Sequence, residues 1–233
     1  MRRAVAAVVL AAVVCGCGSA RQPGESGRAT LWITRDRGAH VLLVKKVAAG
    51  MSAMEALTRN AKVETRYGGR YVQSINGLAG SLDARRDWFY FVNGYEADRG
   101  AADYTLQAGD VEWWDYRSWA KEMRVPVVVG AFPEPFLHGY DGNRRPAVVV
   151  TTQRFAYAQP VARRLHARLL NAGDPIPKGA NAFFLGPPLA DARFEARTQS
   201  GDSAAGAPVR MLFIGHLDDL LAGRYRYRYQ VRP

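Results

Sequence analysis

The chain contains very little cysteine: its two cysteines, Cys15 and Cys17, both lie within the first 17 of 233 residues. The rest of the chain can therefore form no intrachain disulfide, and burial of apolar surface must stabilise its fold. The roughly 200 residues that follow suffice for one large or two small domains with real cores. With 48% hydrophobic and 11% aromatic residues, the composition is typical of a globular protein.

Lysine is also scarce, since only five of the 32 basic residues are lysine and the others are arginine. The formal net charge is +11, but the basic residues form no run longer than two. A surface that follows the phosphates of a nucleic acid is therefore not indicated, and no nucleic-acid partner is expected. A solvated basic face that tolerates anionic envelope polymers explains the charge better.

Catalytic and metal-binding motifs are missing as well. The sequence has no G-x-S-x-G elbow, P-loop or dinucleotide fingerprint, so a non-enzymatic protein is predicted. The four histidines, which show no H-x-x-H or H-E-x-x-H spacing, are His40, His138, His166 and His216. The acids Asp218 and Asp219 beside His216 are better explained as the first turn of a short helix than as metal ligands. No metal site is therefore predicted.

Long apolar runs are absent except near the N-terminus, where Arg2 and Arg3 precede the small-apolar stretch 4–14. This stretch is shorter than the roughly 20 residues of a membrane-spanning helix and is typical of an export signal. Residues 14–17, Val-Cys-Gly-Cys, resemble the bacterial lipobox, which implies removal of residues 1–16 and lipidation of Cys17. An ordinary cleaved signal peptide is the alternative. We thus expect an exported protein, anchored to the outer face of a bacterial membrane, with the glycine-rich segment 17–27 as a flexible tether.

Residues 28–120 are expected to form a first domain. The strands predicted from alternating or continuous apolar residues lie at 31–33, 41–44, 71–75, 88–92 and 111–116. A helix from about Ala53 to Asn60 follows the second strand, and Ser52 with Glu55 forms the S-x-x-E capping box at its start. Two strands, a helix that crosses the sheet and further strands indicate an α+β fold, and the β-grasp is the simplest arrangement that fits.

Residues 121–233 are expected to form a second small α+β domain. Its predicted strands lie at 125–132, 146–152, 182–187, 194–199 and 209–215. An amphipathic helix is predicted over 159–173 and a short one over 218–223. The final segment 224–232 alternates tyrosine with arginine, which predicts a terminal strand with its tyrosines on the core.

The stretch from Trp88 to Gly94 carries the strongest local signals. Asn93-Gly94 is typical of a type I′ hairpin turn, because both residues tolerate positive φ. On the strand before it, Trp88 and Tyr90 lie on one face while Phe89 and Phe91 lie on the other. Only one face can join the helix-covered core. The other face is either a binding surface, which flat aromatic rings favour, or a surface covered by a neighbouring domain.

Several short motifs together resemble a bacterial domain family that is formally of unknown function and is similar to the C-terminal β-domain of transcobalamin and intrinsic factor. The matching residues, spread over about 28–119, are Gly50, Ser52, Glu55-Ala56-Leu57, Tyr71-Val72, Ser74-Ile75, Gly77, 88–94, Gly100-Ala101, Tyr104, Gly109-Asp110, Trp114 and Tyr116. The resemblance implies an exported β-grasp-like domain that in some members binds a corrinoid and in others is a partner module in adhesins. The ligand-binding residues that it implies here are Trp88, Tyr90, Asn93, Tyr104, Trp114 and Tyr116.

The resemblance also implies a second wall for the ligand, because the vertebrate carriers close this domain over the corrin ring with a helical domain. That helical domain is absent here, so residues 121–233 would have to supply the wall. We expect a lipid-anchored extracytoplasmic protein that captures a small molecule, a corrinoid being the first choice, for a membrane transporter. The alternative is a structural or protein-interaction lipoprotein of the cell envelope. An open cleft lined by Trp88, Tyr90 and Trp114 would favour the first, and their burial between the two halves the second.

Overall fold

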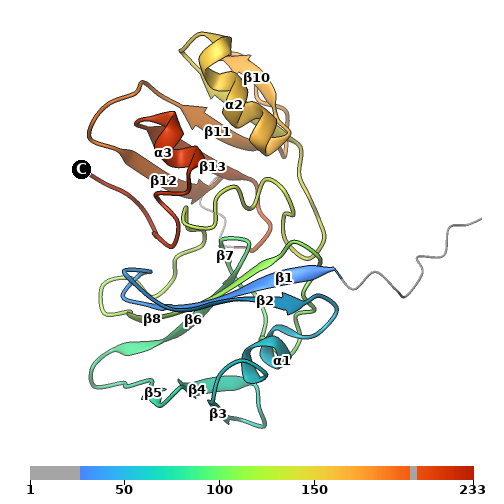
Figure 1. The fold of residues 1–233 in the computed structure, drawn as a ribbon, viewed down its shortest axis with the longest axis vertical. Helices are drawn as coiled ribbons and strands as arrows, with labels where there is room; N and C mark the ends of the chain where they lie inside the picture. Colours follow the sequence, from blue (N-terminus) through green and yellow to red (C-terminus); the bar gives the residue numbers. More distant parts are fainter. Residues whose placement is uncertain (1–26, 200–203) are drawn as a thin grey trace, which may run out of the picture.

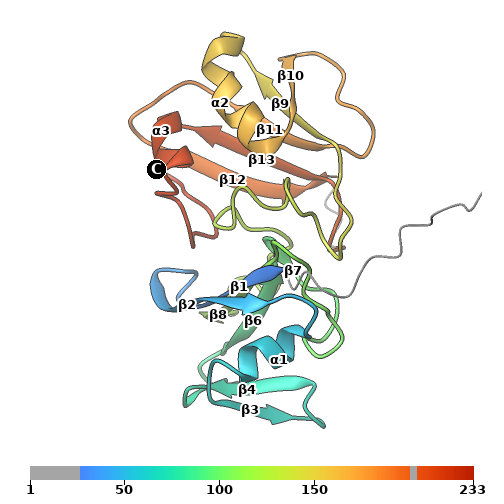
Figure 2. The ribbon, with the colours of Figure 1, turned by 45° about the vertical axis from the view of Figure 1, so that its right-hand side comes forward.

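The structure, a computed structural model, describes residues 27–199 and 204–233. The predicted signal peptide, the lipidated Cys17 and the tether up to residue 26 lie outside the described residues. Two five-stranded sheets are stacked one above the other, and strands outweigh helices in both (Figures 1 and 2). The fold is therefore an α+β mix. In the described part of the chain, no helix has the length and apolarity needed to cross a membrane.

The N-terminal sheet has the strand order β2-β1-β8-β6-β7. Its members are β1 (Arg28–Arg35), β2 (His40–Ala48), β6 (Arg86–Val92), β7 (Tyr95–Glu96) and β8 (Val111–Ser118). Strand β1 pairs with β2 in antiparallel and with β8 in parallel, while β6 pairs with β8 in antiparallel. Four of the five strands predicted for the first domain lie in this sheet, which extends them and adds β7. The fifth, at 71–75, was expected in the same sheet but lies in a separate small one.

One face of the N-terminal sheet is covered by α1 (Ala53–Thr58) and a small sheet. The small sheet has the order β3-β4-β5, with β3 (Val63–Arg66), β4 (Tyr71–Ile75) and β5 (Leu78–Ala79). As predicted, the Ser52 hydroxyl caps α1, because its Oγ accepts a hydrogen bond from the Glu55 amide at 3.1 Å. The reciprocal half of the capping box does not form, since the Glu55 carboxylate pairs with Arg59 one turn later.

The C-terminal sheet has the order β10-β9-β11-β13-β12. Its members are β9 (Ala147–Thr151), β10 (Arg168–Asn171), β11 (Asn181–Leu185), β12 (Arg193–Thr198) and β13 (Val209–Ile214). The first four strands in this order run parallel, and β12 is antiparallel to β13. Helices α2 (Phe155–Leu165) and α3 (Leu217–Leu221) bury apolar residues in the same cluster as Val149, Phe183 and Phe213.

The helix predicted over 159–173 is present only as far as Leu165, and the prediction was wrong for the residues after it. Helix α2 begins earlier and ends at Leu165, where His166 adopts a left-handed φ of 50°. The chain then returns as β10, which pairs in parallel with β9 and buries Leu170. Leucines at 165 and 169 have helical spacing, so the apolar pattern alone did not separate the helix from the strand that follows it.

The strand predicted over 125–132 is also absent, because this segment is irregular, with bends at Pro126 and Val129 and a turn from Gly130 onward. Only Val127 forms a β-bridge, to Tyr95. Val125 and Val128 pack on the N-terminal sheet, while Val127 and Val129 join the other buried cluster. The run of valines therefore reflects a segment buried on both sides, and not a strand of a sheet.

The prediction that 224–232 is a terminal strand was wrong in backbone conformation and right in side-chain direction. The segment forms turns with a single bridge between Val231 and Phe194. The arginines Arg224, Arg226 and Arg228 are exposed. The tyrosines Tyr225, Tyr227 and Tyr229 instead face aromatic side chains of the two sheets. A bent segment permits this, whereas a straight strand would lie along one sheet only.

Candidate functional site

Four of the six predicted ligand residues lie on the α1-covered face of the N-terminal sheet. The rings of Tyr90 and Trp114 stack with their centroids 4.9 Å apart, and those of Trp88 and Tyr116 are 5.3 Å apart. Trp88, Trp114 and Tyr116 are buried, and Tyr90 is half-buried. These rings are part of the core and do not line an open cleft.

The polar ends of these aromatic residues are also occupied. The indole nitrogen of Trp88 donates to the carbonyl of Leu78 at 2.8 Å. The hydroxyls of Tyr116 and Tyr90 donate to backbone carbonyls at 2.9 Å each, in β5 and at residue 99 respectively. A ligand would have to displace these bonds as well as the helix above them. Ligand binding by this set stays a prediction, and the structure gives it no free surface.

The opposite face of the sheet carries Trp32, Phe91 and Trp113, and it is covered too. Tyr229 packs edge-on against Phe91 and Trp113, with ring centroids 5.3 and 5.5 Å apart. Tyr227 packs against Trp32 at 4.6 Å. The aromatic surplus of the sequence therefore fills both faces of one sheet, and the C-terminal segment supplies part of the cover.

Asn93 forms the hairpin turn that the sequence predicts and also a buried hydrogen-bond junction. Asn93 and Gly94 have φ values of 51° and 83°, between the paired Val92 and Tyr95. The Asn93 side-chain amide donates to Asp110 Oδ1 at 2.7 Å and to a carbonyl of the 126–145 loop at 2.9 Å, and its oxygen accepts from a β8 amide at 2.8 Å. Burial raises the pKa of Asp110, although Gln107 and Asn93 hydrogen-bond its carboxylate.

Replacing Asn93 by alanine is therefore expected to destabilise the protein by about 2 to 4 kcal/mol, because buried partners lose their bonds and the left-handed φ becomes strained. Urea unfolding would measure this change. Asn93→Gly is the matched control, since it loses the same bonds and tolerates the φ value. Glycine should therefore be less harmful than alanine, and equal losses would show that backbone strain contributes nothing.

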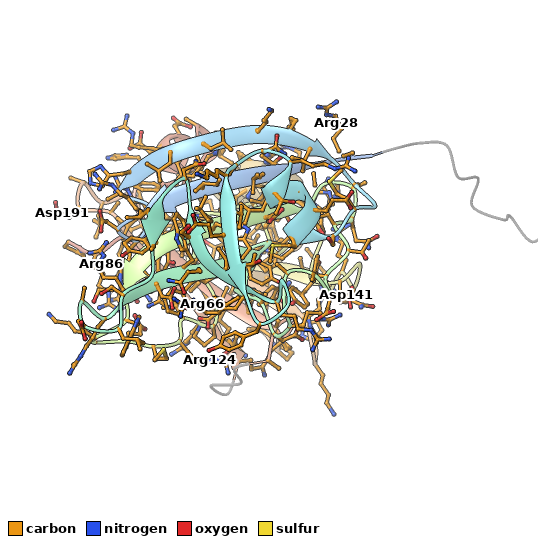
Figure 3. All side chains as sticks on the ribbon, turned by 90° about the horizontal axis from the view of Figure 1, so that it is seen from below. Arg28, Arg66, Arg86, Arg124, Asp141 and Asp191 are labelled. Atoms are coloured by element: carbon orange, nitrogen blue, oxygen red, sulfur yellow. The ribbon has the colours of Figure 1, made fainter. Side chains whose placement is uncertain are left out.

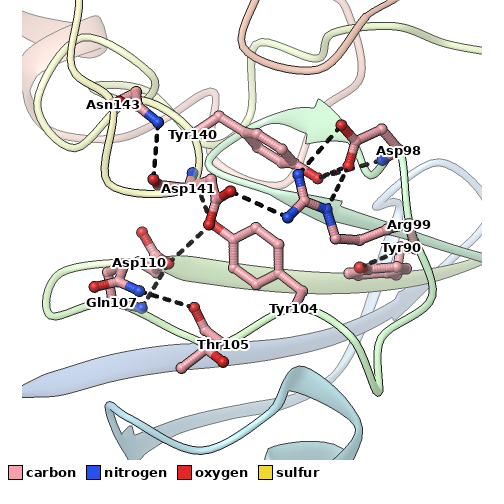
Figure 4. Close-up of polar contacts among 10 residues, drawn as sticks. All are labelled: Tyr90, Asp98, Arg99, Tyr104, Thr105, Gln107, Asp110, Tyr140, Asp141 and Asn143. Atoms are coloured by element: carbon pink, nitrogen blue, oxygen red, sulfur yellow. Dashed lines mark hydrogen bonds and ion pairs between the residues drawn. The ribbon is translucent and has the colours of Figure 1, made fainter.

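Tyr104 extends the junction at Asn93, because its hydroxyl donates to Asp110 Oδ2 at 3.3 Å, and it belongs to a polar cluster that ties the loop around Asp141 to the N-terminal sheet (Figure 4). The guanidinium of Arg99 bonds the carboxylates of Asp98 and Asp141 at 2.9 and 3.0 Å. It also lies 5.9 and 5.8 Å from the ring centres of Tyr104 and Tyr140. The Tyr104 hydroxyl accepts a bond from the Asp141 amide at 3.0 Å. Tyr104 and Asn93 therefore join parts of the fold, and neither presents a free polar group.

Glu112 is a buried acid that the sequence reasoning missed. It lies on β8 opposite Leu31 and Val92 and is fully buried. Trp114 Nε1 donates to its Oε1 at 2.6 Å, and its Oε2 has no partner among the described residues. Burial raises the pKa of Glu112 to about 8, so the carboxyl is largely neutral at pH 7. An acid at an inward position of an apolar strand was the signal available in the sequence.

Charged side chains surround the N-terminal sheet in the view from below, with Arg28 and Arg86 on opposite sides of it (Figure 3). Seven arginines line three hollows beside the C-terminal segment: Arg37, Arg193, Arg197, Arg210, Arg224, Arg228 and Arg232.

The largest of these three hollows is a groove of about 540 Å³ on the C-terminal sheet. We call it the β12–β13 groove; its lining residues are Phe184, Arg193, Glu195, Ala196, Arg197, Arg210, Met211, Leu212, Gln230 and Arg232. Its volume lies in the range of small-molecule sites, about 300 to 1,000 Å³. Its lining combines apolar with charged residues at an open surface, whereas Trp88, Trp114 and Tyr116 are buried. The sequence did not indicate it, because its residues come from three strands and the C-terminus.

The histidines show no metal-site geometry. Among residues 27–199 and 204–233, no three His, Cys, Asp or Glu side chains are grouped so as to hold a metal ion. His138 contacts Glu134 through Nδ1 at 2.5 Å, and this bond raises the pKa of His138. His216 precedes α3, and Asp218 and Asp219 lie in its first turn, as predicted.

Residues 50–118 match a protein family that is described as a domain of unknown function, DUF4430. This match lies inside the range 28–119 of the resemblance and covers less than half of the chain. No curated protein matches the chain.

Two solved structures are similar over part of the chain. One is haptocorrin in complex with Cbi, which is 17% identical with a TM-score of 0.32, and the match covers 39% of this chain and 25% of haptocorrin. The other is a Ruminococcus gnavus protein with a provisional description as a metal-binding protein, 10% identical with a TM-score of 0.33, over 40% of this chain and 97% of that one. The chain thus corresponds to about a quarter of haptocorrin. At these TM-scores, neither similarity identifies a ligand.

Proposed function

We propose that this chain is an extracytoplasmic binding protein, anchored through Cys17, that captures a small molecule without altering it chemically. The observation that carries the proposal is the β12–β13 groove, which is open and of ligand size, whereas the predicted aromatic residues are enclosed. The N-terminal unit then acts as a scaffold of β-grasp type, with β1 and β8 parallel at its centre and α1 on one face. A membrane transporter is the proposed recipient of the ligand.

A corrinoid is the first ligand to test, because the sequence resembles a domain family with corrinoid-binding members. A corrinoid cannot stack on Trp88 or Trp114 while α1 and β5 cover them, so the β12–β13 groove is the proposed binding site. Direct contacts between a corrinoid and the predicted aromatic residues Trp88, Tyr90, Trp114 and Tyr116 would require the core to open. Alanine variants at these tryptophans would damage the fold and are poor probes of binding.

Calorimetric titration of the chain from Ser19 with cyanocobalamin and with cobinamide tests this proposal. We expect micromolar or tighter binding of at least one compound, and a loss of about tenfold or more in Leu212→Trp, because the larger ring fills the groove. Leu189→Trp is the matched control, since Leu189 is exposed outside the groove. Unchanged binding in Leu212→Trp would show that the groove is not the binding site. The absence of heat with either compound would show that the ligand is not a corrinoid.

The second candidate is a protein-interaction module of the envelope, and the edge strand β2 favours it. Val41, Leu42 and Val44 are each about half exposed on this strand, on whose outer side no strand of the described residues pairs. An open edge offers backbone groups that can pair with another chain. A photoreactive residue at position 42 should then form an adduct in cells, while one at Leu189 should not. Absence of an adduct at both positions would count against this candidate.

A further inference from the structure

Two arginines face each other across the β12–β13 ladder without a counter-charge. Arg197 is the register partner of Arg210, so both side chains lie on the same face of the sheet. Both line the β12–β13 groove. Neither forms an ion pair with a carboxylate within the described ranges 27–199 and 204–233. Like charges directly opposite each other on a sheet are destabilising, so this arrangement favours an anion between them.

The other end of the same groove is neutralised from within the chain. Glu195 bonds Arg193 at 2.7 Å and Arg232 at 3.1 Å, so one carboxylate serves two guanidinium groups. The hydrogen bond and the positive charge of Arg193, followed by the weaker effect of Arg232, lower the pKa of Glu195, which therefore stays ionised. The groove thus has one pair of arginines that a carboxylate neutralises and one pair that none neutralises. Its positive charge is therefore concentrated at the end that holds Arg197 and Arg210.

Apolar surface lies beside the uncompensated pair. The guanidinium carbon of Arg210 lies 5.7 Å from the centre of the Phe184 ring, and Leu212, two residues along β13, also lines the groove. Arg210 and Leu212 are half-buried, whereas Arg197 is exposed. A guanidinium held over an aromatic ring keeps its edge free for a planar oxyanion.

From this juxtaposition we propose that the β12–β13 groove binds an organic oxyanion, a carboxylate or phosphate attached to an apolar body. The oxyanion lies between Arg197 and Arg210, and the apolar body rests on Phe184 and Leu212. This inference rests on the proposed function, because it names the ligand class of the same groove. It predicts selectivity for molecules that carry both parts, since phosphate alone makes no contact with Phe184 and Leu212, and a neutral analogue leaves the charges of Arg197 and Arg210 without a partner.

Calorimetric titration of the chain from Ser19, which keeps every described residue, tests the ligand class. The probes are hexyl phosphate, hexanoate, inorganic phosphate and hexanol. We expect hexyl phosphate or hexanoate to bind at least about tenfold more tightly than phosphate and hexanol, and the two organic anions separate phosphate from carboxylate recognition.

The variants Arg197→Gln and Arg210→Gln should each weaken binding of the organic anion about tenfold or more, because each removes a charge-assisted contact. Arg164→Gln, on the exposed face of α2, is the control for loss of one positive charge and should change little. Equal effects of all three substitutions, or equal binding of hexanol, would overturn the inference.

The same titrations separate this inference from the proposed function. If cyanocobalamin or cobinamide binds with an affinity that both arginine substitutions leave unchanged, the binding function stands and the oxyanion site is wrong. If neither the corrinoids nor the organic anions bind, both proposals fail together.

Discussion

Replacing Glu112 by glutamine is expected to stabilise the protein by about 3 to 5 kcal/mol at pH 9 and by less than about 1 kcal/mol at pH 4.5. The carboxyl is fully buried on β8, and its Oε2 has no partner in the described part of the chain. Glutamine has nearly the same shape and no charge, so it removes the cost of a buried carboxylate without leaving a cavity.

The direction of the pH dependence follows from the raised pKa of Glu112, about 8 in the fold against an ordinary 4.5. Between these pH values the folded protein keeps a proton that the unfolded chain has lost. The stability supplied by the protonated Glu112 is complete below its ordinary pKa of 4.5, and it is lost as the pH rises to its pKa in the fold, about 8. In the glutamine variant this contribution no longer changes with pH, so the difference between the two proteins grows as the pH rises.

Urea unfolding of both proteins from pH 4.5 to pH 9 would measure this difference. Glu122→Gln is the matched control, because Glu122 is exposed and pairs with Arg37 at the surface, where ion pairs contribute about 0 to 1 kcal/mol. Asp110 and Asp115 are also buried with raised pKa values, but they are present in every variant. Parallel stability curves for the wild type and Glu112→Gln would show that Glu112 is ionised in the fold.

Replacing Tyr229 by alanine is expected to cost about 3 to 5 kcal/mol of unfolding free energy, in the range measured for buried aromatic residues. Its ring packs on Phe91 and Trp113 of the N-terminal sheet and is buried. Two residues further on, Val231 bridges to Phe194 of the C-terminal sheet. Loss of the ring should therefore loosen the contact between the sheets as well as open a cavity.

Tyr229→Phe is the control that separates the ring from its hydroxyl. The hydroxyl lies near Asp115 and Arg117 without a hydrogen-bond partner among the described residues, and burial raises the pKa of Tyr229 well above its ordinary value. Phenylalanine should therefore cost less than about 1 kcal/mol. Chemical denaturation followed by tryptophan fluorescence would report the change, since Trp113 contacts the ring. A similar cost for Phe and Ala would place the stabilisation in the hydroxyl instead.

Local signals in the sequence were sufficient for most of the secondary structure. The alternation in 71–75 predicted β4 with its observed bounds, and Asn93-Gly94 predicted the hairpin turn that the φ values confirm. Ser52 marked the start of α1. In each case the determining interactions are between residues close in sequence, so a short segment contains the necessary information.

Apolar runs without a local partner were harder to assign. The valines of 125–132 and the tyrosines of 224–232 were assigned to strands, since apolar patterns report which side of a residue is buried and not what covers it. Both segments are packed between the sheets, where turns let successive side chains reach different partners. The helix predicted over 159–173 failed for a related reason, because β9 draws its second half into the sheet.

The sequence by itself determined that this protein is globular without disulfides in its folded part, rich in strands, and equipped with an aromatic hairpin. Only the tertiary structure decided that both aromatic faces are covered, that Glu112 is enclosed, and that Arg197 stands opposite Arg210. The physical reason is that strand composition sets which faces are apolar, whereas the cover of each face and the pairing of charges across strands depend on segments distant in the chain.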